Sequence, residues 1–202
     1  TIEISSANAG KLNTQFKDYF NTSGLKYKSY VLSGNLDNLK ELATLLDRHE
    51  IKYGFSSNGK ASGFSYTSNG QGSMSYDMAM VVSTNQPKGK MVKALLEPDA
   101  KLSTPLTYDI TAWSLPHAYG LKAVASTSLV TANAANPFTT NNSNLNANAA
   151  GYIAKWNSLE DAKLLAALLK EGIKVRFTEK PFANNGISYE RGSLVITKSD
   201  NK

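Results

Sequence analysis

Residues 30–46, YVLSGNLDNLKELATLL, join a short apolar run to a segment in which leucines recur every three or four residues. The run predicts a strand, and the spacing predicts an amphipathic helix. The same plan returns at 152–169, YIAKWNSLEDAKLLAALL, and the two copies match with single-residue gaps. Alternating apolar residues follow each helix, at 51–55 and 173–177, and predict strands with one face toward solvent. We infer an internal repeat, a feature that governs how the rest of a chain is interpreted.

Polar residues mark the ends of both predicted helices. Asn35 is suited to cap the first helix, because a short oxygen-bearing side chain can satisfy the free backbone N–H groups there. Ser158 and Asp161 form the capping-box pattern at the start of the second helix. Gly172 follows the second helix, where a residue in the left-handed conformation commonly ends a helix.

Each copy ends on a continuously apolar run, at 78–83 and at 193–197, which suits a more central strand. Before this run the first copy has a long segment rich in Gly, Ser and Asn at 56–73, whereas the second has only 178–186. A loop as long as 56–73 is expected to be mobile or functional. We predict an α+β (or α/β) fold of two strand-helix-strand-strand repeats related by a pseudo-twofold axis, with a helical insert between them.

The repeats define four segments of one expected compact domain. They are an N-terminal helical segment at 1–29, the first repeat at 30–86, the insert and connection at 87–150, and the second repeat at 151–202. In the insert, whose part 87–121 should cover one face of the sheet, we expect a helix at 88–96 and a helical or turn-rich segment broken at Pro116 and Gly120. The segment 131–150 holds seven asparagines and is expected to be a surface connection.

Composition and charge exclude several classes of protein. Of 202 residues, 41% are hydrophobic and 19% charged, which excludes a collagen, a coiled coil and a disordered tail. No apolar run reaches the roughly 18 residues of a membrane helix. Without cysteine there is no disulfide or thiolate metal site. The net charge is +6, but the densest lysines, Lys88, Lys90 and Lys93, are expected to form a solvated helix edge, so we expect no nucleic-acid partner.

The residues alone indicate no catalytic or metal centre. His49 and His117 are the only histidines, and neither stands in an HxxE or HExxH pattern. His49 is expected to be exposed at a helix end, and His117 to be a turn residue whose candidate polar partner is Asp109. Residues 57–60 and 199–201 imitate the SxxK and SDN elements of penicillin-recognising enzymes. No KTG element follows, and the triplet is expected to lie at a frayed chain end.

The stretch 108–121, YDITAWSLPHAYGL, resembles the YDxTAWxLPxxxGL stretch downstream of the catalytic domain in secreted zinc carboxypeptidase-type proteins of Gram-negative bacteria. Residues 151–196 are similar to the segment that follows it in those proteins. This metallopeptidase-associated region carries no HxxE pair here, so no catalytic residue is carried over. Six positions define the resemblance and have no assigned chemical role: Tyr108, Asp109, Trp113, Leu115, Pro116 and Gly120.

The resemblance implies a secreted or periplasmic parent protein whose zinc lies in a separate catalytic domain, although residues 1–10 lack the apolar run of a signal peptide. It implies a non-catalytic accessory domain that contacts other domains of the same polypeptide and holds no cofactor. The alternative is a ligand- or glycan-binding module in which residues 56–73 close over a small polar ligand. An enzyme in its own right has only Asp109 and His117 as candidate polar residues.

Overall fold

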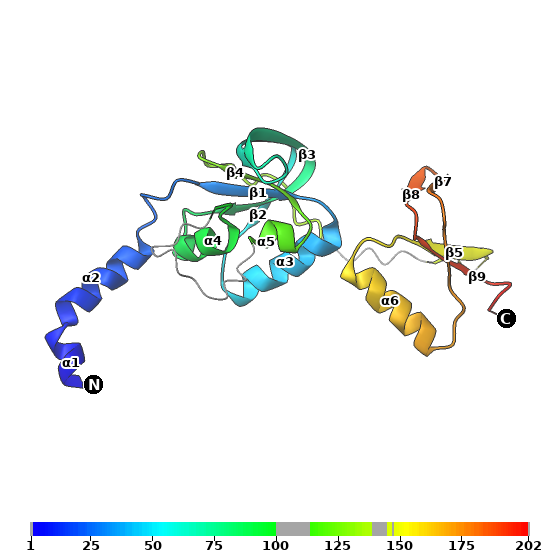
Figure 1. Ribbon diagram of the computed structural model, residues 1–202, viewed down its shortest axis with the longest axis horizontal. Coiled ribbons are helices and arrows are strands. Elements are labelled where there is room, and N and C mark those ends of the chain that lie inside the picture. Colours follow the sequence, from blue (N-terminus) through cyan, green and yellow to red (C-terminus); the bar gives the residue numbers. More distant parts are fainter. Residues whose placement is uncertain (1, 100–113, 139–144, 147, 202) are drawn as a thin grey trace. The chain divides into compact units, whose positions relative to one another are not determined.

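The computed structural model describes residues 2–99, 114–138, 145–146 and 148–201. Contacts divide the chain into two compact units, unit 1 (Thr1–Phe138) and unit 2 (Thr139–Lys202). This differs from the single compact domain expected from the sequence. The described part is mixed α+β, with six α-helices and antiparallel sheets (Figure 1). None of the described helices has the length and apolar character that crossing a bilayer requires.

Unit 1 is built on four antiparallel strands. They are β1 (Ser29–Ser33), β2 (Gly54–Ser65), β3 (Gly70–Ser83) and β4 (Lys122–Ser126). Their pairing order, β1-β3-β2-β4, returns to β1 and closes a barrel. Strands β2 and β3 pair along a long hairpin, whereas β2 meets β4 only at Phe64↔Ala125 and Ser65↔Val124. The far end of β2 therefore closes the barrel.

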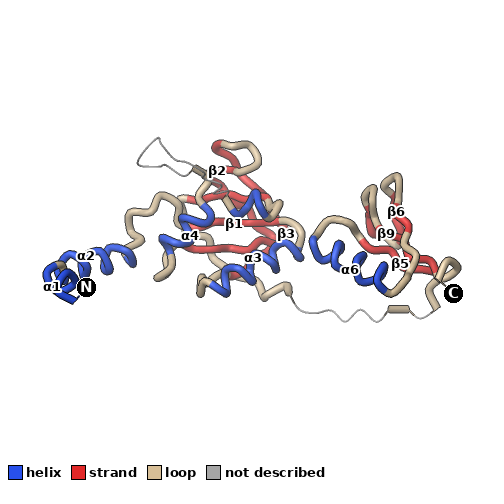
Figure 2. Tube along the Cα trace, turned by 60° about the horizontal axis from the view of Figure 1, so that its bottom comes forward, coloured by secondary structure: helices blue, strands red, loops and turns tan. Residues whose placement is uncertain are grey.

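Three helices cover one side of these strands: α3 (Leu36–Arg48), α4 (Gly89–Leu96) and α5 (Leu115–Ala118). Figure 1 shows them on the same side, and Figure 2 shows α3 and α4 beside β1 and β3. Because strand side chains alternate between faces, every second residue of β1 and β3 reaches the helices. The main core joins these strand and helix side chains: Tyr30, Leu32, Met80, Val82, Leu39, Leu42, Leu46, Val92 and Leu96. The other face of the strands packs a second cluster: Val31, Ala61, Tyr76, Ala79 and Val124.

Two further helices, α1 (Ile2–Ala7) and α2 (Ala9–Phe20), precede the strands of unit 1, as predicted for the helical segment 1–29. The helix expected at 88–96 is confirmed as α4, and Val92 and Leu96 bury its inner face. The described helices of the insert, α4 and α5, therefore cover one face of the strands, as the sequence predicts.

The described part of unit 2 has one helix, α6 (Leu159–Lys170), and five short strands. The strands are β5 (Gly151–Ala154), β6 (Arg176–Phe177), β7 (Phe182–Asn184), β8 (Ile187–Tyr189) and β9 (Leu194–Thr197). The sheet order is β5-β9-β6, and β7 and β8 form a separate hairpin. The closing strand of each predicted copy lies between the first and second strands, β3 between β1 and β2 and β9 between β5 and β6. The predicted central position of both closing strands is confirmed.

The predicted helix ends are also confirmed. The Asn35 side chain accepts a hydrogen bond from the backbone N–H of Asp37 at 2.8 Å. Ser158 accepts one from the backbone N–H of Asp161 at 3.2 Å, and the Asp161 carboxylate accepts one from the N–H of Ser158 at 2.9 Å, which completes the capping box. Gly172 follows α6 with φ of +72°. Local side-chain chemistry thus sets where α3 and α6 begin, and how α6 ends.

The prediction of a long loop at 56–73 is wrong. These residues belong to the β2–β3 hairpin, whose turn lies between Ser65 and Gly70. The sequence misleads because Gly, Ser and Asn are poor strand formers in general. Here their small size permits close approach: a Cβ on Gly63 would overlap the carbonyl oxygen of Ala125, and one on Gly59 would meet the Tyr76 hydroxyl.

The strands predicted at 51–55 and 173–177 are shorter than expected, because β2 begins at Gly54 and β6 contains only Arg176 and Phe177. In unit 2 the segment 178–186 is also not a plain loop, since it contains β7. The two predicted strands are shorter because residues 51–53 and 173–175 have no ladder partner among the described residues.

One expectation about the segments between the repeats is corrected, and two are confirmed. Pro116 does not break a helix but lies in the first turn of α5, where its missing N–H is not needed. Gly120 does form a turn after that helix, with φ of +61°. The described first part of the Asn-rich connection, 131–138, lies at the surface as expected, since each of its residues is exposed or half-buried. Ala134 pairs with Phe55 there, and the Phe138 ring lies edge-on to Phe55 at 5.1 Å.

Candidate functional site

The residues that define the family resemblance are only partly described. Tyr108, Asp109 and Trp113 lie outside the described residues, so the structure does not test a pair between Asp109 and His117. Leu115 packs against the main core, Pro116 is buried, and Gly120 turns the chain toward β4. His117 is exposed, and its ring centroid lies 5.6 Å from that of Tyr66. The described positions of the motif, Leu115, Pro116 and Gly120, shape a turn and bring no polar side chain to a site.

The other motif candidates lie on different elements of the two units. His49 is exposed at the C-terminal end of α3, as predicted. Ser57 and Lys60 lie on β2 in unit 1, whereas the triplet 199–201 belongs to unit 2. Within the part of the chain that the structure describes, no group of three or more His, Cys, Asp or Glu side chains could hold a metal ion.

The lysines at 88, 90 and 93 form a helix edge whose charges have local partners. Lys88 lies 3.5 Å from a carboxylate oxygen of Glu50, and Lys93 lies 3.5 Å from one of Glu97. The Lys90 ammonium donates to the backbone carbonyl of Asp18. Such an edge gives less positive potential than three isolated ammonium groups would.

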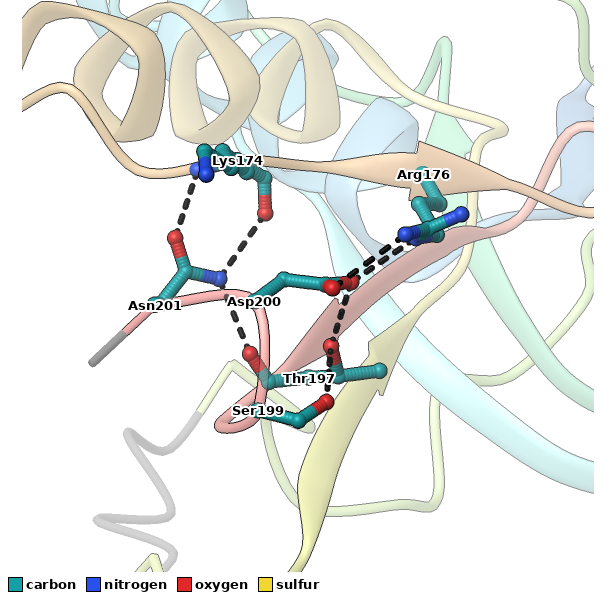
Figure 3. A network of polar contacts seen from close by, with 6 residues as sticks. All are labelled: Lys174, Arg176, Thr197, Ser199, Asp200 and Asn201. Carbon is teal, nitrogen blue, oxygen red and sulfur yellow. Dashed lines mark hydrogen bonds and ion pairs between the residues drawn. The ribbon is translucent and has the colours of Figure 1, made fainter.

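The chain end at 199–201 is held in place, contrary to the expected fraying (Figure 3). Arg176 donates to both carboxylate oxygens of Asp200, from Nε at 2.8 Å and from Nη2 at 3.2 Å, and Thr197 donates to Asp200 at 2.7 Å. Asn201 accepts from the N–H of Lys174 at 2.7 Å and donates to its carbonyl at 3.0 Å. Hydrogen bonds from Arg176 and Thr197 lower the pKa of Asp200 to about 2. This network joins β6 to the end of β9 and has a structural role.

A cavity of about 360 Å³ lies in unit 1 beside β1 and α4. Its volume falls in the range of small-molecule sites, which is about 300–1,000 Å³. The apolar wall of the cavity consists of Leu25, Tyr27 and Phe64. The charged side chains that line it are Lys26, Lys93, Glu97 and Asp99. A mixture of apolar wall and a few polar groups is typical of ligand sites.

Tyr30 on β1 is the most unusual residue of this cavity. Its side chain is 1% exposed, and its hydroxyl has no hydrogen-bond partner among the described residues. Burial raises the pKa of Tyr30, and the Glu97 carboxylate and Tyr27 raise it further. Tyr30, Glu97 and Tyr27 are all among the residues that line the cavity. Tyr30 is thus a neutral phenol that can both donate and accept.

The charged groups around the cavity differ in whether they contact another described side chain. The Lys93 ammonium pairs with Glu97 at 3.5 Å, and the Lys26 ammonium lies 4.9 Å from the Tyr27 ring centroid. Asp99 is exposed at the rim and forms no ion pair with a described residue. The two ammonium groups and two carboxylates together carry no net charge, so the cavity has no single-sign field.

Sequence reasoning missed this cavity. In the sequence Tyr30 is recognisable only as the first residue of a predicted strand. The one signal that could have indicated the cavity is its hydroxyl group, because side-chain alternation along the strand turns Tyr30 toward the helices. Comparison of the chain with protein-family models, curated proteins and solved structures finds no match.

Proposed function

We propose that this chain is a non-catalytic accessory domain of a secreted or periplasmic zinc carboxypeptidase-like protein. In this role it contacts other domains of the same polypeptide, and the zinc chemistry belongs to the separate catalytic domain. The resemblance of residues 108–121 supports the proposal, and the described part of that stretch forms a turn packed on the core through Leu115 and Pro116.

The observation that carries the proposal is an uncovered apolar face on α2. No residue of α2 is buried, and its four large hydrophobic side chains, Leu12, Phe16, Tyr19 and Phe20, are 40–65% exposed. Their spacing of three and four residues gathers them on one side of the helix. Contiguous apolar surface of this kind typically marks an interaction site. The proposed occupant is another domain of the parent protein.

Helix α6 presents a second surface of this type. It also has no buried residue, and Leu159, Leu164 and Leu169 are exposed, as is Trp156 just before it. An amphipathic helix usually gains its stability from burying its apolar face. The accessory role explains why both helices keep large apolar side chains at the surface.

The proposal includes the relation between the two repeats. We propose that the segments 30–86 and 151–202 derive from one strand-helix-strand-strand plan and are two repeats related by a pseudo-twofold axis. The matching strand orders, β1-β3-β2 and β5-β9-β6, support this relation, as does the helix that follows the first strand in each.

Sequencing the coding region upstream of the Thr1 codon tests the accessory role. The expected result is an open frame that encodes an HxxE pair and a later histidine. A start codon followed by a signal peptide immediately before Thr1 would overturn the proposal. The ligand- or glycan-binding alternative, now favoured by the cavity beside Tyr30 rather than by residues 56–73, would then lead.

Hydrogen exchange tests the α2 surface itself. The α2 amides should exchange more slowly in the parent protein than in this chain, and Phe16→Asp should remove that difference. Thr14→Asp, which places the same charge on the opposite face of the helix, is the matched control and should leave the protection in place. Equal exchange in the parent and in this chain would contradict docking through α2.

A further inference from the structure

We propose that the cavity beside Tyr30 binds a small zwitterion, namely a free amino acid with an apolar side chain. The site consists of the Tyr30 hydroxyl, the Asp99 carboxylate, the Lys26 ammonium and the apolar wall of Leu25, Tyr27 and Phe64. This inference is independent of the accessory role, since it concerns a cavity within unit 1 and not the α2 or α6 surface.

The buried hydroxyl is the first reason to expect a ligand. A buried polar group without a partner loses its hydrogen bonds to water and gains none in return, so such groups are rare in folded proteins. Tyr66 has a similar burial but donates its hydroxyl hydrogen to the carbonyl of Leu96, which shows how this core otherwise satisfies its phenols. Tyr30 lacks such a bond with any described residue and is one of the residues that line the cavity. A polar atom of a bound molecule can satisfy it.

The charges select the class of ligand. Glu97 already pairs with Lys93, so Asp99 is the carboxylate left to bind an ammonium group. The Lys26 ammonium, above the Tyr27 ring, can pair with a carboxylate, and the neutral Tyr30 phenol can donate to the same group. A ligand with one charge of each sign leaves the balanced site neutral, whereas a singly charged ligand does not.

The apolar wall sets the third requirement. Leu25, Tyr27 and Phe64 offer apolar and aromatic surface. Burying aliphatic carbons against such surface is favourable at roughly 25 cal/mol per Å². A leucine- or phenylalanine-like side chain fits this wall, and a sugar, which presents hydroxyl groups on most sides, leaves polar atoms against it.

Calorimetric titration of the full chain with L-leucine tests the proposal. Two analogues each lack one charge: 3-methylbutylamine lacks the carboxylate, and 4-methylpentanoate lacks the ammonium group. L-Leucine should bind and raise the unfolding temperature, and each analogue should bind about tenfold more weakly, because it loses a charge-assisted hydrogen bond. Glucose serves as the probe for the glycan alternative and should not bind.

Three variants assign the contacts. Tyr30→Phe should weaken L-leucine binding about tenfold through the loss of one hydrogen bond to a charged group. Asp99→Asn should weaken L-leucine binding by a similar factor but leave 4-methylpentanoate unchanged, because that analogue has no ammonium group. Tyr76→Phe, which removes a hydroxyl bonded to Ser56 in the second cluster, is the matched control and should bind normally.

Several outcomes would overturn the inference. The first is that neither L-leucine nor L-phenylalanine binds at roughly 10 mM, the limit of a useful affinity. The second is that L-leucine and one of its analogues bind equally well. The third is that a folded Tyr30→Phe variant binds L-leucine with unaltered affinity. Glucose binding in place of L-leucine would transfer the site to the glycan alternative. Variants of Phe16 on α2 should bind L-leucine normally, so failure of the accessory role and failure of this site are distinguishable.

Discussion

Tyr66 and Tyr30 are buried tyrosines of one core that differ in what their hydroxyl groups contact. Tyr66 donates to the Leu96 carbonyl at the end of α4, whereas Tyr30 has no partner among the described residues. Tyr66→Phe should therefore lower the free energy of unfolding by about 1–2 kcal/mol, and Tyr30→Phe should leave it unchanged or raise it slightly. Urea unfolding of the ligand-free variants measures both effects. A larger loss in Tyr30→Phe than in Tyr66→Phe would contradict this assignment.

Asp200 makes the stability of unit 2 depend on pH. Its contacts with Arg176 and Thr197 lower its pKa from 3.8 to about 2 in the folded state. A folded pKa below the unfolded one means that the contribution is present above pH 4 and disappears as pH falls toward 2. Asp200→Asn should thus be less stable than the wild type at pH 7, with the difference vanishing near pH 2. Thermal unfolding across this range checks it, and a constant difference would speak against the Arg176 contact.

The barrel closure depends on Gly63, where β2 reaches β4. A Cβ at this position would overlap the Ala125 carbonyl oxygen, and the backbone φ of +155° is itself unfavourable for other residues. Gly63→Ala should therefore lower the free energy of unfolding by about 2 kcal/mol or more. Gly70→Ala, at the start of β3, has only the Ser68 carbonyl oxygen at 3.8 Å and is the control. Chemical denaturation of both variants tests the difference, and equal stability would refute the close approach.

Helices and strands differ in how far their sequences predicted them. Leucine spacing and capping residues such as Asn35 and Ser158 predict helices α3 and α6. These signals can be recognised in the sequence because they act within a few residues of one another. The β2–β3 hairpin was missed because its small residues are favourable only against distant partners, as Gly63 is against Ala125. The cavity escaped prediction for the same reason: Tyr30, Phe64 and Glu97 come together only after the strands and α4 have packed.

The whole chain should unfold as two separable units. Unit 1 contains almost the entire buried core, whereas Leu194 on β9 is the one buried hydrophobic side chain in the described part of unit 2. Truncating a buried leucine to alanine typically costs about 2–5 kcal/mol, which a small unit with so little core cannot absorb. Leu194→Ala should thus abolish amide protection in β5 and β9 and leave it intact in β1 and β3.

Native-state hydrogen exchange followed by NMR measures the amide protection of both units in one sample. Val82→Ala, in the main core of unit 1, is the reciprocal variant and should accelerate exchange in the barrel strands of unit 1 but not in β5 and β9. Independent units predict that the double variant shows the sum of the two effects, because sites without shared contacts act additively. Accelerated exchange in both units after either substitution would instead indicate a single cooperative domain, the organisation that the sequence favours.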